Sequence, residues 1–406
     1  MNLFKNIPFL TIAFLLVIAC KDVKKETLAA RDESKVLVSQ ELPWSERMAL
    51  SIMQRNPKAW QTENDSIPKW NYKIGLLCTA YEQLYKRTQD DTYLGYIQDY
   101  AEAIIDSTGM IYGYEMKEYN IDMINSGKML FWLYNKTKDV RYKKALDQLR
   151  TQLIGHPRTP SNGFWHKKIY PNQMWLDGLY MGAPFYAQYN TVFEEGDKLD
   201  DIAHQFELIW EKTYDAKTGL LFHAWDESKQ MAWADKTTGK SPNFWSRSLG
   251  WYVMALVDVL DFFPTNHPKK PVLEQQLVQL SAAILKFQDD KGVWYQVPNL
   301  PDKSGNYLES SGTCMFAYAF AKGSQKGYLS KEYLTIANTI FDGIVKEFIT
   351  VEPNGLVNIN KVCKSAGLGG NPYRDGSFEY YMSEPVVTNN LHGTGPFILA
   401  ANQLNR

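Results

Sequence analysis

The chain has 406 residues, of which 45% are hydrophobic, so it is long enough to bury a large core. Its formal net charge is −1, which argues against a general nucleic-acid-binding protein. Beyond its first twenty residues no apolar stretch approaches the length of a transmembrane helix, so an otherwise soluble protein is expected.

The first twenty residues have the pattern of an export signal. Lys5 precedes an uncharged stretch, residues 6–19, which is too short to cross a bilayer comfortably. The stretch ends in a small residue, Ala19, and Cys20 follows directly. This order resembles a bacterial lipoprotein signal, in which Cys20 becomes the lipidated first residue of the mature protein. We therefore predict a signal peptide over residues 1–20.

Residues 21–40 are charged and lack a regular apolar pattern, which predicts a flexible tether. The protein would then meet a membrane only through the lipid on Cys20. Residues 21–25 contain no run of acids, so we expect the periplasmic side of a membrane rather than the cell surface.

The other cysteines are Cys78, Cys314 and Cys363. Their number is odd, and Cys78 and Cys314 lie in apolar segments. Buried free thiols are therefore expected rather than a disulfide framework.

From about residue 41 the chain consists of segments with apolar residues at three- and four-residue spacing, which predicts helices. No stretch has a comparable alternating pattern of strands, and no change of composition marks a boundary, so one domain is expected over 41–406. The twelve predicted helices span residues 45–55, 70–88, 92–107, 121–137, 140–154, 175–192, 198–212, 246–262, 271–287, 311–322, 331–348 and 391–404.

A weak internal repeat links these helices. The segments that begin at Leu84 and Leu133 share Leu, Tyr, Thr and Asp at a separation of 49 residues, and a looser copy begins at Ala321. Each copy ends one helix, makes a polar turn and starts another, which predicts a solenoid or a closed toroid. Twelve helices make six hairpins, and six hairpins can close into an all-α (α/α)6 barrel. The repeat alone would also allow an open superhelix.

Four long polar segments interrupt the helices, at residues 155–174, 213–245, 288–310 and 349–390. Loops of this length are usually functional or disordered. They are rich in Trp, Tyr and His, and aromatic rings suit stacking against the C–H face of a sugar. At one end of a toroid such loops would converge on a funnel.

Several chemistries lack their motifs in this sequence. There is no HExxH, paired-His or CxxC spacing for zinc, and no GxSxG segment of a serine hydrolase. The segment Gly367-Leu368-Gly369-Gly370 is not followed by the Lys-Ser/Thr of a phosphate-binding loop, so we interpret it as a turn. No metal and no cofactor is therefore predicted.

Asp177 is the first candidate for chemistry, because it lies among the aromatic and aliphatic side chains between Trp175 and Met181. Desolvation raises the pKa of a carboxyl group, and a carboxyl group that keeps its proton near neutral pH can donate it and take it back. The alternative is that Asp177 caps a helix, since Asp is a favoured N-cap. Three side chains that suit an anionic ligand lie just upstream: His166, Lys167 and Lys168.

Asp122 is a second acid, near the start of another predicted helix, and capping is again the alternative. Sugar-cleaving enzymes commonly use such a pair of acids, which meet here only if the loops converge. In a third cluster, Arg247 would either grip a carboxylate or form a structural salt bridge, and Trp251 would also suit the core. The cluster comprises His223, Trp225, Asp226, Trp233, Trp245, Arg247 and Trp251.

Together these segments resemble one enzyme family. They are similar to the unsaturated rhamnogalacturonyl hydrolases of glycoside hydrolase family 105 and, more distantly, to the unsaturated glucuronyl hydrolases of family 88. The resemblance covers most of the chain after the tether and implies an (α/α)6 barrel, in agreement with the helix count. It rests on NID (120–122), GFWHK (163–167), YPNQMWLDGLYMGAP (170–184), FHAWDE (222–227) and WSRSLGWY (245–252).

The resemblance implies roles for individual residues. Asp177 would be the general acid/base, and Asp122 would be the second carboxylate, which holds sugar hydroxyls or stabilises charge. Residues 392–395 also look like the family but receive no role. The residues implied to line a pocket for the terminal uronic acid are Tyr72, His166, His223, Trp245, Arg247 and Trp251.

The implied activity removes the terminal 4,5-unsaturated uronic acid from an oligosaccharide made by a polysaccharide lyase, through protonation of C4 and hydration at C5. Three alternatives stay open: a glycosidase for saturated uronides, a glycan-binding lipoprotein without activity, and a lyase on the same fold. The anionic substrate would carry rhamnose next to the uronate, as in rhamnogalacturonan or sulfated ulvan fragments. The basic residues that would meet either a sulfate or only solvent are Lys167, Lys168, Lys240 and Arg374.

Overall fold

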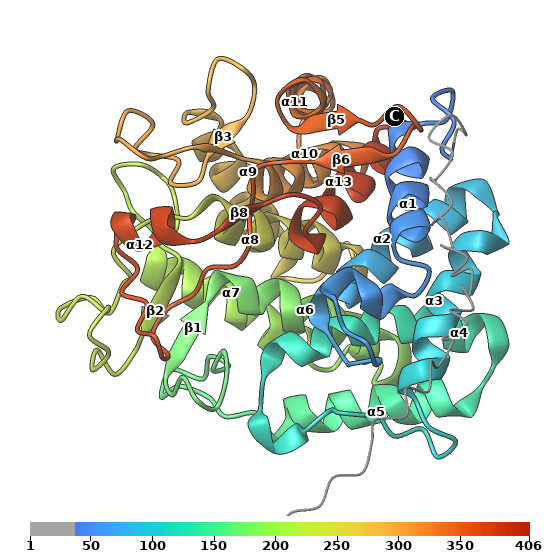
Figure 1. The fold of residues 1–406 in the computed structure, drawn as a ribbon. Coiled ribbons are helices and arrows are strands. Elements are labelled where there is room, and N and C mark those ends of the chain that lie inside the picture. Colours follow the sequence, from blue (N-terminus) through green and yellow to red (C-terminus); the bar gives the residue numbers. More distant parts are fainter. Residues whose placement is uncertain (1–36) are drawn as a thin grey trace, which may run out of the picture.

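Thirteen α-helices make up about half of residues 37–406, the part of the chain that the computed structural model describes (Figure 1). The expected signal peptide, Cys20 and the tether as far as residue 36 lie outside the described residues. The inner ring consists of α2 (Tyr72–Thr88), α4 (Lys128–Thr137), α6 (Leu176–Phe193), α8 (Ser246–Val259), α10 (Ser310–Gln325) and α13 (Leu391–Gln403). The outer ring consists of α1 (Trp44–Arg55), α3 (Asp91–Ile104), α5 (Val140–Gly155), α7 (Leu199–Thr213), α9 (Lys270–Leu285) and α11 (Glu332–Phe348).

The inner ring closes on itself. Its helices pack as neighbours in chain order, with the 3-10 helix η3 (Ile121–Gly127) completing the contact of α4 with α6, and α13 packs back against α2. The outer helices α3, α5, α7, α9 and α11 each pack on the inner helix that precedes them in the chain, and α1 packs on α13. The predicted (α/α)6 barrel is therefore confirmed, and the open superhelix is excluded.

Inner and outer helices differ in how their side chains are buried. In α10 every residue from Ser310 to Ser324 is buried, and in α8 every residue except Asp258 is buried. In the outer helix α11 the buried residues recur at three- and four-residue spacing, for example Ala337, Ile340 and Phe341. A helix that is buried on all sides belongs in an interior, whereas an amphipathic helix covers it. This difference places α8 and α10 inside and α11 outside.

All twelve predicted helices are present, with some changes at their ends. Residues 121–127, expected as the start of an α-helix, form η3 instead, and α12 (Phe378–Ser383) was not predicted. The remaining 3-10 helices are η1 (Ala59–Glu63), η2 (Met116–Glu118) and η4 (Leu260–Phe262). Four antiparallel strand pairs were also not predicted: β1 (Gln173–Trp175) with β2 (Ala224–Asp226), β3 (Trp294–Tyr295) with β4 (Leu308–Glu309), β5 (Ile349–Val351) with β6 (Val357–Ile359), and β7 (Val362–Cys363) with β8 (Val386–Val387).

The long segments gather at one end of the ring, as expected. Each of the four leads from the C-terminus of an outer helix to the N-terminus of the next inner helix. At the other end the connections 89–90 and 138–139 are only two residues long. The pair of β1 and β2 joins the segment before α6 to the segment before α8 (Figure 1). The N-termini of the inner helices therefore all lie at the end that the long segments cover.

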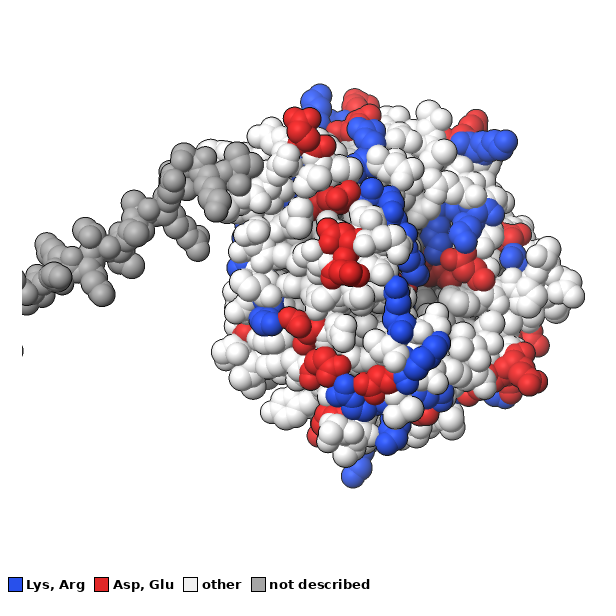
Figure 2. All heavy atoms as spheres, turned by 90° about the vertical axis from the view of Figure 1, so that its right-hand side faces the viewer, with Lys and Arg blue, Asp and Glu red and all other residues white. Residues whose placement is uncertain are grey.

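Charges of both signs are mixed on the face of the molecule shown in Figure 2, which is the right-hand side of Figure 1. Over the described residues many charged side chains pair with one another: for example, Arg141 lies 2.9 Å from Glu102, and Arg87 lies 3.1 Å from Glu46. Within residues 37–406 no helix combines the length and the apolar character that a membrane span requires.

The cysteines behave as predicted. Cys78, Cys314 and Cys363 are all free and buried. Burial raises the pKa of the Cys78 and Cys314 thiols, which keeps them in the less reactive protonated form.

Lys128, the first residue of α4, is buried inside the ring without a hydrogen-bond partner for its Nζ among the described residues. Its Nζ lies 3.7 Å from the centre of the Tyr180 ring. Burial lowers the pKa of Lys128 to about 7, and the carboxylate of Asp258 only partly opposes this. Lys322, in contrast, contacts Asp258 at 2.7 Å and Asp261 at 2.9 Å, and these acids raise its pKa despite burial.

We expect Lys128→Met to stabilise the protein most at pH values below about 7, where the folded state must bury the ionised ammonium group. Between about 7 and the ordinary lysine value of 10.5 the unfolded chain binds more protons than the folded chain, so this group makes the wild type more stable as the pH rises. The difference in the free energy of unfolding between Lys128→Met and the wild type should shrink by up to about 1.4 kcal/mol per pH unit over this range. Urea unfolding at several pH values measures it.

Lys217→Met provides the control, because Lys217 is exposed. The free energy of unfolding of Lys217→Met should differ from that of the wild type by the same amount at each pH. The prediction would be contradicted if the free energy of unfolding of Lys128→Met also differed from the wild-type value by the same amount at each pH.

Candidate active site

The inner helices present polar side chains at the end of the ring where the long segments lie. Asp122, Asp177, Arg247 and His392 are each the second residue of their helix, η3, α6, α8 and α13, and Tyr72 is the first residue of α2. The N-terminus of an α-helix carries a partial positive charge and unpaired N–H groups, so converging N-termini favour an anionic ligand.

Neither acid caps its helix. Trp175 occupies the N-cap of α6, and Asn120 occupies the N-cap of η3, where its side chain accepts a hydrogen bond from the N–H of Asp122 at 3.1 Å. The capping alternative is therefore excluded for Asp122 and Asp177, and both carboxylates are available for other contacts.

A cavity of about 270 Å³ lies at this end of the ring. It is open to solvent, and its lining contains four cationic and two acidic side chains, which suits an anionic ligand. The lining residues are Tyr72, Lys73, Asp122, His166, Lys167, Tyr170, Trp175, Asp177, Met181, Trp245, Arg247, Trp251, Ser365, Ala366, Arg374 and His392.

A chain of hydrogen bonds leads away from Asp177. Its Oδ2 lies 3.0 Å from Nε2 of His223, and Nδ1 of His223 lies 2.7 Å from the hydroxyl of Tyr381. Both partners are fully buried, and burial raises the pKa of Tyr381 well above its usual range. When the phenol donates to Nδ1, the proton of His223 lies on Nε2 and is donated to Asp177. Within residues 37–406 no group hydrogen-bonds Oδ1 of Asp177, and Asp177 is one of the residues that line the cavity.

Asp122 is held differently. Its Oδ2 lies 2.8 Å from Nζ of Lys167, and its Oδ1 lies 3.5 Å from Nε2 of His166. Burial alone would raise the pKa of Asp122, but Lys167 and His166 outweigh it, and the pKa is lowered. Burial likewise opposes the charge of Lys167, yet Asp122 raises the pKa of Lys167. Asp122 is therefore an ionised acceptor and a poor proton donor at neutral pH.

Three stacked rings form one wall of the cavity. The rings of His166 and Trp175 lie 4.3 Å apart at 8°, and the rings of Trp175 and Tyr170 lie 5.1 Å apart at 17°. Burial lowers the pKa of His166 to about 4 in spite of Asp122, so the ring is neutral. A Cβ at Gly178 would lie 3.1 Å from Nδ1 of His166, so the glycine after Asp177 leaves the room that this ring occupies.

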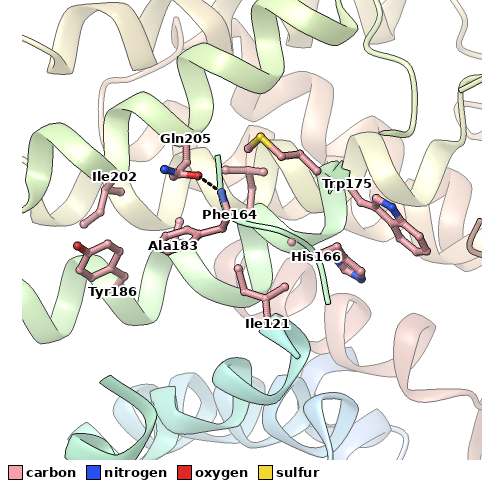
Figure 3. A pocket seen from close by; sticks show the side chains of 11 residues that line it. Ile121, Phe164, His166, Trp175, Ala183, Tyr186, Ile202 and Gln205 are labelled. Atoms are coloured by element: carbon pink, nitrogen blue, oxygen red, sulfur yellow. Dashed lines mark hydrogen bonds between the residues drawn. The ribbon is translucent and has the colours of Figure 1, made fainter. Parts of the chain in front are cut away.

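A separate, mostly apolar cavity lies behind this wall (Figure 3). His166 and Trp175 lie at one end of it, and Tyr186 and Ile202 lie at the other. Its volume of about 20 Å³ suffices for about one water molecule. This cavity is too small for a sugar and supports the wall of the larger one.

Two tryptophans also line the cavity. Trp245 and Trp251 line the large cavity, although each is only 1% exposed. The indole N–H of Trp245 donates to Gln296 at 3.0 Å, and Trp251 stacks on Tyr180 with 4.8 Å between ring centres. Trp251 is thus both a core residue and a lining residue.

Arg247 is fixed by the protein itself. Its Nε donates to Ser311 at 2.8 Å, its Nη2 donates to the carbonyl of Cys363, and Nη2 lies 3.7 Å from the carboxylate of Glu309. Both of the alternatives expected for Arg247 are therefore partly met: it forms a buried salt bridge and also borders the cavity. Because Nε, Nη1 and Nη2 of Arg247 all have partners within the protein, its guanidinium is not free to bind a ligand carboxylate through two parallel hydrogen bonds.

Arg247 also contacts His392. Nη1 of Arg247 lies 3.0 Å from Nδ1 of His392, and Nε2 of His392 lies 2.8 Å from the hydroxyl of Tyr72. The carbonyl oxygen of Lys364 also lies 3.2 Å from Nδ1, so a donor and an acceptor both reach this nitrogen. Burial lowers the pKa of His392 well below its usual value, so the ring is neutral. Tyr72, His392 and Arg247 therefore form one hydrogen-bonded row that borders the cavity.

The structure brings together nearly all of the predicted site residues. Asp122, Asp177 and five of the six expected pocket residues border the cavity, whereas His223 lies behind Asp177 and does not line it. Sequence analysis missed Tyr381 and gave His392 no role. One sequence feature could have identified His392: like Asp177 and Arg247, it lies near the start of a predicted helix. Within residues 37–406 no group of three or more His, Cys, Asp or Glu side chains could hold a metal ion.

The chain is similar to several known proteins. A structure of a C. acetobutylicum glycoside hydrolase from family 105 superposes with a TM-score of 0.86 at 45% identity and covers 90% of this chain and 99% of that chain. An Agrobacterium fabrum protein is 34% identical over 226 residues, 54% of this chain and 96% of that protein. An unsaturated rhamnogalacturonyl hydrolase of Bacillus subtilis is 23% identical over 279 residues, 67% of this chain and 76% of that protein.

A family model described as Glycosyl Hydrolase Family 88 matches residues 44–406, which is nearly the whole described chain. Together with the family 105 structure, this match agrees with the barrel and with the acids at its loop-covered end. The chain therefore belongs to the glycoside hydrolases of families 88 and 105, as its sequence resemblance predicted.

Proposed function

We propose that the protein removes the terminal 4,5-unsaturated uronic acid from oligosaccharides produced by a polysaccharide lyase, with rhamnose as the next sugar. The family membership and the similarity to the B. subtilis unsaturated rhamnogalacturonyl hydrolase support this proposal. So does the cationic lining of the cavity, since the substrate carries a carboxylate.

The observation that carries the proposal is the different setting of the two acids. Asp122 is ionised and held by Lys167, so it suits the acceptance of hydrogen bonds from sugar hydroxyls. Asp177 lines the cavity and uses one oxygen for His223, and the other has no hydrogen-bond partner among residues 37–406. A single acid/base that works alone fits this arrangement better than two equivalent acids on either side of a bond.

The substrate's C4=C5 double bond is an enol ether, because C5 also carries the ring oxygen. Asp177 donates a proton from Oδ1 to C4, and the ring oxygen stabilises the positive charge that develops at C5. The carboxylate that forms is a stronger acceptor than the carboxylic acid, so the hydrogen bond from His223 strengthens as the proton leaves. An interaction that is stronger in the transition state than in the ground state accelerates the reaction.

Hydration completes the reaction. The Asp177 carboxylate takes a proton from a water molecule whose oxygen bonds to C5, which regenerates the carboxylic acid and gives a hemiketal. The bond between C5 and the ring oxygen then breaks and leaves a ketone at C5. The former ring oxygen becomes a hydroxyl on C1, and this hemiacetal collapses to an aldehyde and releases the neighbouring sugar. Tyr72 and Asp122 are placed to hold hydroxyl groups during these steps.

We expect Asp177→Asn to lower kcat by about 10²- to 10⁴-fold, the usual contribution of a general acid/base, while the fold stays intact. The measurement follows the ultraviolet absorbance of the conjugated alkene, which falls as the wild type consumes a lyase-generated oligosaccharide. Products from rhamnogalacturonan and from ulvan, assayed side by side, identify the preferred polymer.

The control for Asp177→Asn is Asp215→Asn, since Asp215 is also partly buried but lies outside the cavity lining. It should retain wild-type activity. An undiminished rate in Asp177→Asn would reject the acid/base role. Absorbance that rises indicates a lyase instead, and activity on chains never treated with lyase indicates an ordinary glycosidase.

Tyr381→Phe tests the hydrogen-bond chain behind Asp177. Without the phenol, His223 loses the donor that fixes its proton on Nε2, so we expect kcat to fall about tenfold, the equivalent of one hydrogen bond, with KM nearly unchanged.

The matched control is Tyr96→Phe, which removes another buried phenol whose hydroxyl donates to the carbonyl of Asn56 at 2.8 Å, far from the cavity lining. Its kcat and pH profile should equal those of the wild type. The same loss in both variants would show that Tyr381 matters only for stability.

We also propose that the protein is an exported lipoprotein, attached through Cys20 and facing the periplasm, on the basis of the N-terminal sequence pattern. Cys20→Ser should move the protein from the membrane fraction to the soluble fraction and abolish labelling by a fatty acid. Cys78→Ala, which alters a buried thiol of α2, should leave both unchanged. A wild-type protein that is soluble and unlabelled would contradict this proposal.

A further inference from the structure

A second cavity of about 530 Å³ adjoins the first. The two cavities share Tyr170 and Arg374, which are joined by a 2.9 Å hydrogen bond from Nη2 of Arg374 to the hydroxyl of Tyr170. The rest of the second cavity comes from residues 370–373 and from Tyr380, Ser383 and Glu384. Arg374 and Tyr170 therefore form a neck between the catalytic cavity and the second one.

The glycine-rich turn that sequence analysis left without a function holds this arginine. Nε of Arg374 donates to the carbonyl of Gly369 at 2.8 Å, and Nη2 donates to the carbonyl of Leu368 at 3.1 Å. The backbones of Gly369 and Arg374 also bond to each other in both directions. A Cβ at Gly367 would lie only 2.5 Å from Nη1, so a larger residue there would displace the guanidinium. The turn therefore holds the Arg374 side chain in a fixed position.

Arg374 differs from the other cations of the catalytic cavity in having no acidic partner among residues 37–406. Lys73 pairs with Glu63, Lys167 pairs with Asp122 and Arg247 pairs with Glu309. Neutral carbonyl and phenol oxygens fix Arg374 in place but leave its charge uncompensated, and its Nη1 makes no hydrogen bond within the described chain. A fixed guanidinium with a free N–H suits a carboxylate.

The second cavity otherwise has the features of a sugar site. Tyr373 is 47% exposed, and its hydroxyl is anchored by the N–H of Trp233 at 2.9 Å, so its ring is held at the surface. Ser383 and Glu384 add a hydroxyl and a carboxylate, which can bond sugar hydroxyls. An aromatic ring beside a few polar groups is a common composition for carbohydrate binding.

We propose that the second cavity binds the released side of the substrate and that Arg374 contacts a second uronate there. This rests on the proposed function. In a polymer that alternates uronate and rhamnose, a lyase product carries the unsaturated uronate, then rhamnose, then another uronate. With the first uronate in the catalytic cavity, the rhamnose lies at the neck and the second uronate reaches the second cavity. The enzyme therefore prefers a tetrasaccharide to the disaccharide of the same polymer.

The test compares kcat/KM for the unsaturated disaccharide and tetrasaccharide of one alternating polymer, read from the loss of alkene absorbance. The wild type should favour the tetrasaccharide by about tenfold, through KM, as expected for one charge-assisted hydrogen bond. Arg374→Gln should bring this ratio near one. Ser383→Trp should do the same by filling the second cavity, and because Ser383 is exposed the change is compatible with folding.

Lys168→Gln is the matched control, because it removes an exposed positive charge that lines neither cavity. It should keep the wild-type ratio. A wild-type ratio near one, or a wild-type ratio that survives in either Arg374→Gln or Ser383→Trp, would overturn the second site while the proposed function stands. A wild type that consumes neither substrate would overturn the proposed function and this inference with it.

Discussion

Closure of the inner ring is the constraint on which the site depends. Because α13 packs back against α2, the N-termini of all inner helices point to one end, and residues from distant parts of the sequence meet there. Asp122, Asp177, Arg247 and His392 each use the same position, the second residue of a helix. The partial positive charges of these N-termini add to the cationic side chains, so the backbone itself prepares the cavity for an anion.

Much of this was accessible from the sequence. Apolar spacing located the twelve helices, and a recurring hairpin suggested how they are grouped, because both depend on local periodicity. The features that sequence analysis did not predict depend on contacts between distant segments. The place of His223 behind Asp177 follows from Tyr381, which is 158 residues away, and the role of His392 follows from Arg247, which is 145 residues away. Short strand pairs such as β1 with β2 carry too few residues to show an alternating pattern.

Asp122 and Asp177 show how environment separates two chemically identical groups. Both begin their helices and both border the cavity. Lys167 approaches Asp122 closely and keeps it ionised, whereas Asp177 has the ring of His223 as its partner. A cation in contact favours the ionised carboxylate, so Asp122 is the acceptor of the two. The fold brings Asp122 and Asp177 to the same cavity, and their different partners suit them to different roles.

The inner helices and the segment that carries Arg374 hold their side chains in different ways. The inner helices are buried on nearly all sides, so the groups that they position cannot move without repacking the ring. The segment that carries Arg374 is instead held by its own turn and by a few hydrogen bonds to Tyr170 and Trp233. Arg374 contacts neither Asp177 nor His223, whereas Tyr381, in α12 of the same segment, bonds His223. A change at Arg374 therefore alters binding beyond the neck while Asp177 stays fixed at the start of α6, so specificity can vary in a loop without a change in the acid.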